Sequence, residues 1–90
     1  MIRVHLLITG KVQGVGYRNN AKRRADLLDI RGWVKNLSDG SVEIVAQGSE
    51  RGVEGFISWC QKGALFANVK NVAVEREELA GDFWDFKIVR

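Results

Sequence analysis

The sequence predicts an α+β sandwich, in which two helices cover one face of an antiparallel sheet. Two patterns predict it: apolar residues at every second position, typical of half-buried strands, and apolar residues three or four positions apart, typical of amphipathic helices. The hydrophobic share of 46% and the charged share of 28% are those of an ordinary globular protein. Ninety residues fit one compact domain, so we expect a single domain over residues 1–90.

The first strand and the first helix flank a loop rich in glycine. Residues 2–9 alternate apolar and polar side chains, which predicts a strand with one buried face. After the loop, apolar residues recur at helical spacing up to Asp29, near which we expect the helix to end. Asn19 or Asn20 is the expected N-terminal cap. The apolar positions of this helix are Ala21, Ala25 and Leu28.

A hairpin is expected in the middle of the chain. Residues 33–37 and 42–46 have strand character, and the second segment alternates apolar and polar side chains. Ser38-Asp39-Gly40 between them is typical of a tight turn. The hairpin therefore supplies the second and third strands.

The last part of the chain is expected to hold a helix and further strands. Ser49 is the expected cap of the helix and Gly63 its end. Two strands over 69–74 and 83–89 follow. We describe the order as β-α-β-β-α-β, a ferredoxin-like sandwich. The apolar stripe of this helix comprises Val53, Phe56, Ile57 and Cys60.

Composition excludes several classes of protein. No stretch approaches the roughly 20 apolar residues of a membrane span, and polar residues interrupt the N-terminal apolar run, unlike a signal peptide. The single cysteine, Cys60, excludes an internal disulfide and a multi-cysteine zinc site. The net charge of +3 is too small for the footprint of a nucleic-acid binder. We therefore expect a cytoplasmic protein without membrane or nucleic-acid partners, and a monomer is the simplest expectation.

The loop Gly10-Lys11-Val12-Gln13-Gly14-Val15-Gly16-Tyr17-Arg18 is the strongest candidate site. Backbone N–H groups in such a turn can converge on an anion, and the following helix N-terminus adds unpaired donors. Gly14 and Gly16 permit positive φ, and Arg18 offers a planar fork for two oxygens of a phosphate or carboxylate. A plain flexible turn with a solvated Arg18 is the alternative at this point.

This loop resembles the first signature of the acylphosphatases, G-[RK]-V-Q-G-V-x-[FY]-R. Gly32-Trp33-Val34-Lys35-Asn36, with Asp39-Gly40 and Val42-Glu43 after it, is similar to their second signature. Asn36 follows Arg18 by 18 residues, as in that family. The resemblance covers essentially the whole chain.

The resemblance implies hydrolysis of the carboxyl–phosphate bond of small-molecule acyl phosphates, with no metal and no other cofactor. It implies that Arg18 binds the phosphoryl group together with loop N–H groups around Val15, Gly16, Tyr17 and Arg18. It also implies that Asn36 positions the attacking water. The proton of this water could pass to a substrate phosphate oxygen, since the residues offer no evident base.

Other candidate residues have simpler interpretations. His5 is expected to be structural or at the surface, and Cys60 to pack in the core. The run Lys22-Arg23-Arg24 is expected to be a solvated helix face, although it could also attract anionic substrates. Trp33 and Trp84 are expected to anchor the core or the sheet.

Two positions depart from the common pattern of the family that the chain resembles. Asp29 stands where glycine is usual, and Ala64-Leu65 replaces a frequent proline. Two rival functions remain: a non-catalytic anion-binding module, like the acylphosphatase-like domain of hydrogenase-maturation carbamoyltransferases, and a single-stranded RNA binder. The latter would use Arg3, His5, Lys35 and Lys87 on one sheet face.

Overall fold

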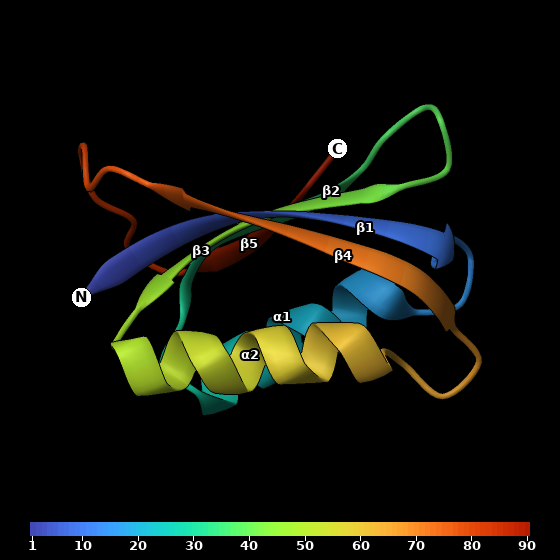
Figure 1. Cartoon of the computed structure of the whole chain (residues 1–90), viewed down its shortest axis with the longest axis horizontal. Coiled ribbons are helices and arrows are strands. Elements are labelled where there is room, and N and C mark those ends of the chain that lie inside the picture. The colour runs from blue at the N-terminus through green and yellow to red at the C-terminus, as the bar shows by residue number, and fades with distance from the viewer.

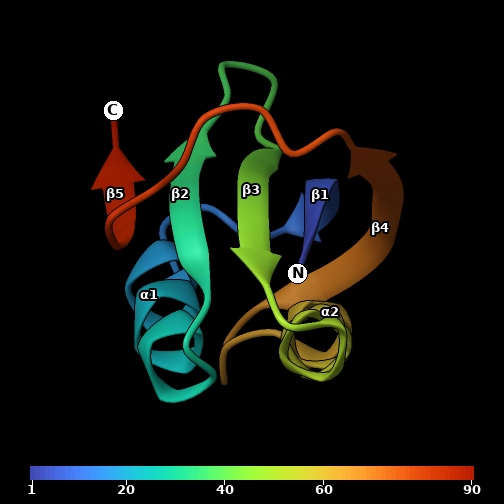
Figure 2. The same cartoon turned by 90° about the vertical axis from the view of Figure 1, so that its left-hand side faces the viewer.

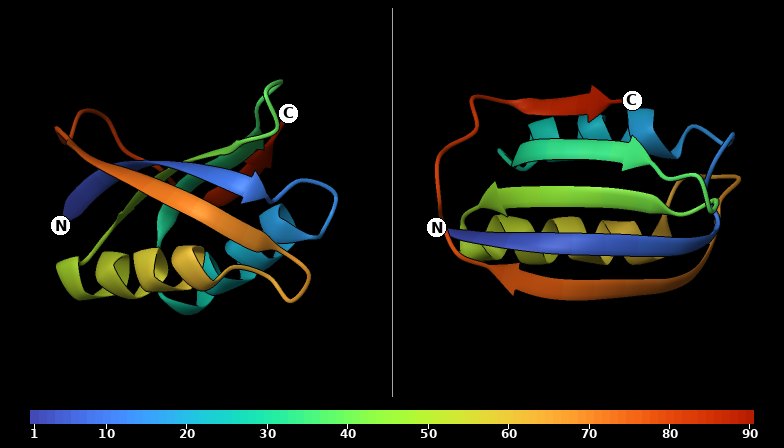
Figure 3. Two further views of the ribbon diagram at one scale, coloured as in Figure 1. Left: turned by 45° about the vertical axis from the view of Figure 1, so that its right-hand side comes forward. Right: turned by 90° about the horizontal axis from the view of Figure 1, so that it is seen from above.

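The computed structural model, which describes residues 1–90, is a five-stranded sheet with both helices on one face (Figures 1 and 2). The strand order across the sheet is β4-β1-β3-β2-β5 (Figure 3, right). Three neighbouring pairs are antiparallel and the β2–β5 pair is parallel. The elements are β1 (Ile2–Lys11), α1 (Tyr17–Leu27), β2 (Arg31–Asn36), β3 (Val42–Gly48), α2 (Glu50–Lys62), β4 (Asn68–Glu77) and β5 (Phe86–Val89).

The predicted ferredoxin-like α+β class is confirmed, with one addition to the sheet. Both segments after α2 join it, so the chain has one strand more than the order β-α-β-β-α-β contains. The extra strand, β5, runs parallel to β2 because the segment between β4 and β5 crosses to the far edge of the sheet (Figure 2). The prediction of an entirely antiparallel sheet is therefore wrong for the β2–β5 pair.

The core lies between the sheet and the two helices. Alternate residues of β1, including Leu6 and Ile8, face the helices, as the strand pattern predicts. Helix α1 presents Ala21 and Ala25 to the sheet, and small side chains at these positions let the helix approach closely. Helix α2 contributes Val53, Phe56 and Cys60, while Ile57 is only half-buried.

The segment between β4 and β5 is held against the open face of the sheet. Arg3 donates to Gln47 Oε1 at 2.8 Å and to the carbonyl of Ala80 at 2.9 Å. Its guanidinium lies 4.7 Å from the centre of the Phe83 ring. Because Phe83 serves this contact, β5 begins at Phe86 rather than at Phe83 as expected. Trp84 beside it is 95% exposed, so the expectation that it anchors the core is wrong.

The starts of the two helices differ in how well they were predicted. Ser49 caps α2 as expected, with its hydroxyl accepting from the amide of Gly52 at 3.0 Å. Neither Asn19 nor Asn20 caps α1, because Gly16 adopts a left-handed conformation that starts the helix earlier. The side chain of Asn20 instead donates to the carbonyl of Gly16 at 2.8 Å.

Helix α1 ends in a Schellman turn around Asp29. The amide of Ile30 donates to Ala25 O at 2.8 Å, and the amide of Asp29 donates to Asp26 O at 3.3 Å. Asp29 has φ of 57°, the only positive φ outside glycine. Glycine is the residue usually found at this position of the turn, because a Cβ is strained there.

Replacing Asp29 with glycine should therefore raise the free energy of unfolding by up to about 1 kcal/mol. The matched control is Asp26→Gly, one turn earlier within the helix, which should lower it by roughly 0.5–1 kcal/mol. Urea denaturation followed by circular dichroism measures both. Equal destabilisation by the two changes would contradict the argument.

Candidate active site

The glycine-rich loop between β1 and α1 adopts the conformation expected of an anion cradle. Gly14 has φ of 74° and Gly16 has φ of 77°, both in the left-handed region. A Cβ built on Gly14 would meet nothing within 4 Å, so this backbone faces open space. Such positive-φ turns let successive N–H groups point to one side of the chain.

The N-terminus of α1 continues the loop with unpaired donors. The amide of Asn20 makes the first bond of the helix, to Gly16 O at 3.1 Å. The amides before it in the first turn have no partner within the helix. No side chain caps this end, and no acidic residue lies in the first turn. The positive end of the helix is thus left for an external anion.

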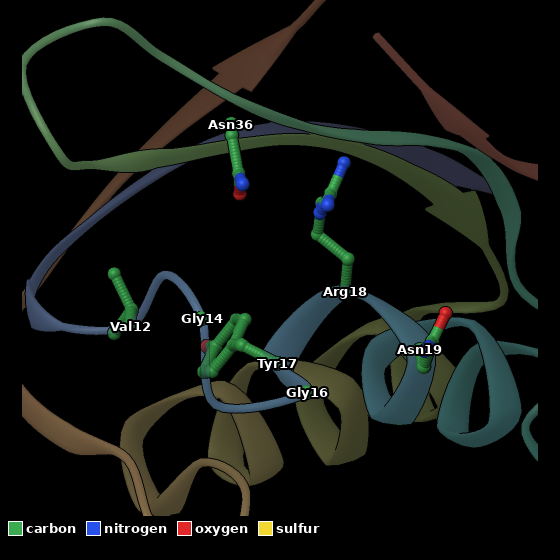
Figure 4. Close-up of a pocket in the computed structure, with 7 residues that line it drawn as sticks. All are labelled: Val12, Gly14, Gly16, Tyr17, Arg18, Asn19 and Asn36. Atoms are coloured by element: carbon green, nitrogen blue, oxygen red, sulfur yellow. The ribbon is translucent and has the colours of Figure 1, made fainter.

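Arg18 lies in this first turn, where a cation is unfavourable to the helix dipole. Its side chain rises from α1 toward the sheet, on the same side as the Asn36 side chain (Figure 4). No carboxylate lies within ion-pairing distance of it, since the ion pairs of the molecule are His5–Glu43 and Lys22–Asp26. The guanidinium is therefore available to an anionic ligand.

Asn36, the last residue of β2, faces the loop from the sheet (Figure 4). Its Oδ1 is buried and is the one buried side-chain polar atom without a hydrogen-bond partner. An unpaired buried acceptor costs about 1–3 kcal/mol, and such atoms in native proteins usually have a functional partner. A water molecule that donates to Oδ1 would remove this cost.

These groups surround one cavity of ≈ 160 Å³. It contains three of the four predicted substrate-binding residues, Gly16, Tyr17 and Arg18, together with Asn36. Val15 does not line it, because its side chain packs against the core; the predicted role of its amide stays a prediction. Val12 and Asn19, which were not predicted as site residues, also line the cavity, together with Gly14.

Gln13 connects the loop to the turn that follows Asn36. Its Nε2 donates to Leu37 O at 2.7 Å and to Ser41 O at 2.8 Å. The turn is closed by the amide of Leu37, which donates to Ser41 O at 2.9 Å. One side chain therefore fixes the cradle relative to the end of β2.

Asp39 stabilises the same turn. The hydroxyl of Ser41 donates to Asp39 Oδ1, and the amide of Ser41 donates to it at 2.9 Å. The hydroxyl bond, followed by the amide bond, holds the pKa of Asp39 below its ordinary value. Asp39 is thus a turn residue, as expected.

Tyr17 contributes its backbone, not its hydroxyl, to the cavity. Its side chain is 1% exposed and points away from Asn36 toward α2 (Figure 4), where the hydroxyl donates to Cys60 O at 2.9 Å. Burial raises the pKa of Tyr17 far above its ordinary value of 10.0. This phenol stays protonated at neutral pH and takes no part in proton transfer.

The other titratable candidates lie outside the cavity. His5 Nε2 donates to Glu43 Oε2 at 2.8 Å, on the open face of the sheet. Burial raises the pKa of the Cys60 thiol to about 12, which suits a core residue. Lys22 is more than a solvated charge, since its Nζ donates to the carbonyl of Phe86 at 2.9 Å.

The open face does not have the charge pattern of an RNA-binding surface. The register places Glu77 beside Arg3, Glu75 beside His5 and Glu43 beside Lys35. Acidic and basic side chains therefore alternate on this face. Basic residues would have to dominate it to attract a phosphate backbone.

Two further findings concern the whole molecule. Neither helix has the length and apolar content that a membrane crossing requires. No three or more His, Cys, Asp or Glu side chains gather closely enough to hold a metal ion.

Known proteins share both the sequence and the structure of this chain. The family model described as "Acylphosphatase" matches residues 4–88. The acylphosphatase of Methylococcus capsulatus is 43% identical over 90 residues, which are 100% of this chain and 98% of that protein. The crystal structure of acylphosphatase from Bacillus subtilis superimposes with a TM-score of 0.97 at 34% identity, covering 100% of both chains.

A longer protein contains a similar unit. Full-length HypF, solved in its phosphate- and nucleotide-bound form, aligns with a TM-score of 0.84 at 26% identity. The alignment covers 100% of this chain but 12% of that one. The two acylphosphatases described above, in contrast, match along 98% and 100% of their own length, and both signature segments lie in the matched range. The chain belongs to the acylphosphatase family.

Proposed function

We propose that this chain is a monomeric, cytoplasmic, metal-independent acylphosphatase that hydrolyses acyl phosphates to a carboxylate and inorganic phosphate. The observation that carries the proposal is the meeting of three unsatisfied groups in one cavity. These are the uncapped N-terminus of α1, the Arg18 guanidinium and the unpaired Asn36 Oδ1. The first two would bind a phosphoryl group and the third a water molecule.

The proposed reaction is attack by water on phosphorus. The water donates one hydrogen bond to Asn36 Oδ1, and its oxygen forms the new bond to phosphorus. The bond between phosphorus and the acyl oxygen breaks, and its electron pair leaves with the carboxylate. The proton of the water passes to a phosphoryl oxygen, so the enzyme supplies no base. A carboxylate is a good leaving group, so positioning and charge stabilisation can carry the catalysis.

The cavity lining supports a reaction without a metal. Its seven residues include no carboxylate, imidazole or thiol, the side chains that hold metal ions in proteins. Arg18 and the backbone N–H groups offer positive charge and donors where the phosphoryl oxygens would lie.

The alternative function is a non-catalytic anion-binding module, which the likeness to a small part of HypF keeps open. Release of phosphate from benzoyl phosphate, a simple aryl acyl phosphate, separates the two. The enzyme releases phosphate with turnover in the presence of a metal chelator, whereas the module binds phosphate and releases none.

Arg18→Ala and Asn36→Ala should each lower kcat/KM for benzoyl phosphate by at least about 100-fold, because each removes a group that faces the transition state. Arg18→Lys should lower kcat/KM by a similar factor, since an ammonium lacks the two-pronged donor geometry of guanidinium. Exposed Arg23 on the same helix supplies the control, and Arg23→Ala should stay within about twofold. Circular dichroism checks that each variant folds. Full activity of a folded Arg18→Ala protein would rule out the proposed role.

Gln13→Ala should lower kcat roughly tenfold while KM changes less, because the cradle and the Asn36 turn lose their shared anchor. The free energy of unfolding should fall by about 1–2 kcal/mol through the two lost hydrogen bonds. Gln61→Ala, at an exposed position of α2, is the control. Steady-state kinetics and urea denaturation measure the two effects. A loss of stability with unchanged kcat would limit Gln13 to a structural role.

The pH dependence of kcat should show no enzyme group titrating between about pH 5.5 and about pH 8.5, because no side chain in the cavity ionises there. His5→Gln should leave the profile unchanged. The ionised carboxylate of Asp39 stabilises the turn next to Asn36, and its pKa is lowered from the ordinary value of 3.8. This stabilisation is therefore lost only as the pH falls below 3.8, outside the range of the test. A titration in kcat that disappears in His5→Gln would contradict the mechanism.

A further inference from the structure

A second depression adjoins the candidate active site. It has a volume of ≈ 550 Å³ and is lined by Arg18, Asn19, Ile88 and Arg90. Arg18 and Asn19 line the first cavity as well, so the two spaces meet at the first turn of α1. Asn36 lines the first space only, and Arg90 lines the second only.

The parallel pairing of β5 with β2 brings Arg90 to this end of the sheet. Lys35 is opposite Val89, so both strands end beside each other, and Asn36 and Arg90 are the next residues along each chain. Phe86 is buried on the helix side, and side chains of a strand alternate between faces. Arg90 is four residues after Phe86, so its side chain is expected on the same, helix-facing side of the sheet. This agrees with the depression, which Arg90 and Arg18 both line.

The lining of this depression combines positive charge with an apolar surface. Two of its four lining residues are arginines and none is an aspartate or glutamate, and neither arginine takes part in an ion pair. Ile88 is 36% exposed and offers an apolar surface in the same space. The combination suits a short carbon skeleton that ends in an anion.

We propose that this depression is a subsite for the acyl group, and that Arg90 makes the enzyme prefer acyl phosphates whose acyl group carries a carboxylate. This proposal rests on the proposed function. A phosphoryl group in the first cavity would lie beside Arg18, and the acyl group attached to it would extend past Arg18 and Asn19 into the adjoining depression. Arg90 is a specificity residue, because it contacts the acyl group and not the reacting atoms.

The test compares two substrates of nearly equal size, 4-carboxybenzoyl phosphate and its neutral amide, 4-carbamoylbenzoyl phosphate. The unaltered protein should hydrolyse the carboxylate about three- to fivefold better in kcat/KM at low salt, the range of an exposed ion pair. Arg90→Gln should reduce the ratio to about one while leaving the amide substrate unaffected. High salt should also reduce the ratio, because it screens exposed charges.

Arg23→Ala is the matched control, since Arg23 is exposed on α1 and lines neither space. It should preserve the ratio, which separates a local contact from the general positive charge of the surface. A ratio of one in the unaltered protein, or a preference that survives Arg90→Gln, would overturn the subsite and leave the proposed function standing. Hydrolysis of neither substrate would overturn both.

Discussion

The burial of Tyr17 between the two helices is the constraint on which the candidate site depends. Its hydroxyl donates to the carbonyl of Cys60 in the last turn of α2, where the carbonyls of a helix lack partners within it. Its ring lies 5.2 Å from that of Trp59. These contacts join the start of α1 to the end of α2. The next residue, Arg18, then begins from a fixed backbone, and its side chain rises from α1 toward the sheet (Figure 4).

A fixed first turn matters because donors that bind a phosphoryl group are most effective when they need no rearrangement. The loop enters this turn through Gly16, and Gln13 connects it to the end of β2. The site therefore joins two parts of the chain that lie on different layers of the sandwich. Tyr17 fixes the start of α1 against α2, and Gln13 fixes the loop against the turn that follows β2. The contacts of these two residues therefore set the distance between Arg18 and Asn36.

The local parts of the site could be predicted from sequence, whereas its outer edge could not. Gly14 and Gly16 indicated a left-handed loop, and the motif resemblance pointed to Asn36, which faces the same cavity. Arg90 gave no such signal, because its position depends on β5 joining the sheet in parallel. That pairing depends in turn on contacts between distant residues, notably those that Arg3 makes with Gln47 and Ala80. The cap of α1 was missed because Gly16, a residue without a side-chain acceptor, begins the helix by its conformation alone.

Several local costs meet at one point of the molecule. A cation in the first turn opposes the helix dipole, an uncapped helix end leaves donors unpaired, and Asn36 Oδ1 is buried without a partner. The start of the other helix, α2, follows the usual rules, because Ser49 caps it. A cavity where several local rules are broken together is often a functional site. An anion and a water molecule would relieve the three costs together, whereas a plain turn would relieve none of them, and this is the physical reason for proposing that the loop is a cradle for the substrate.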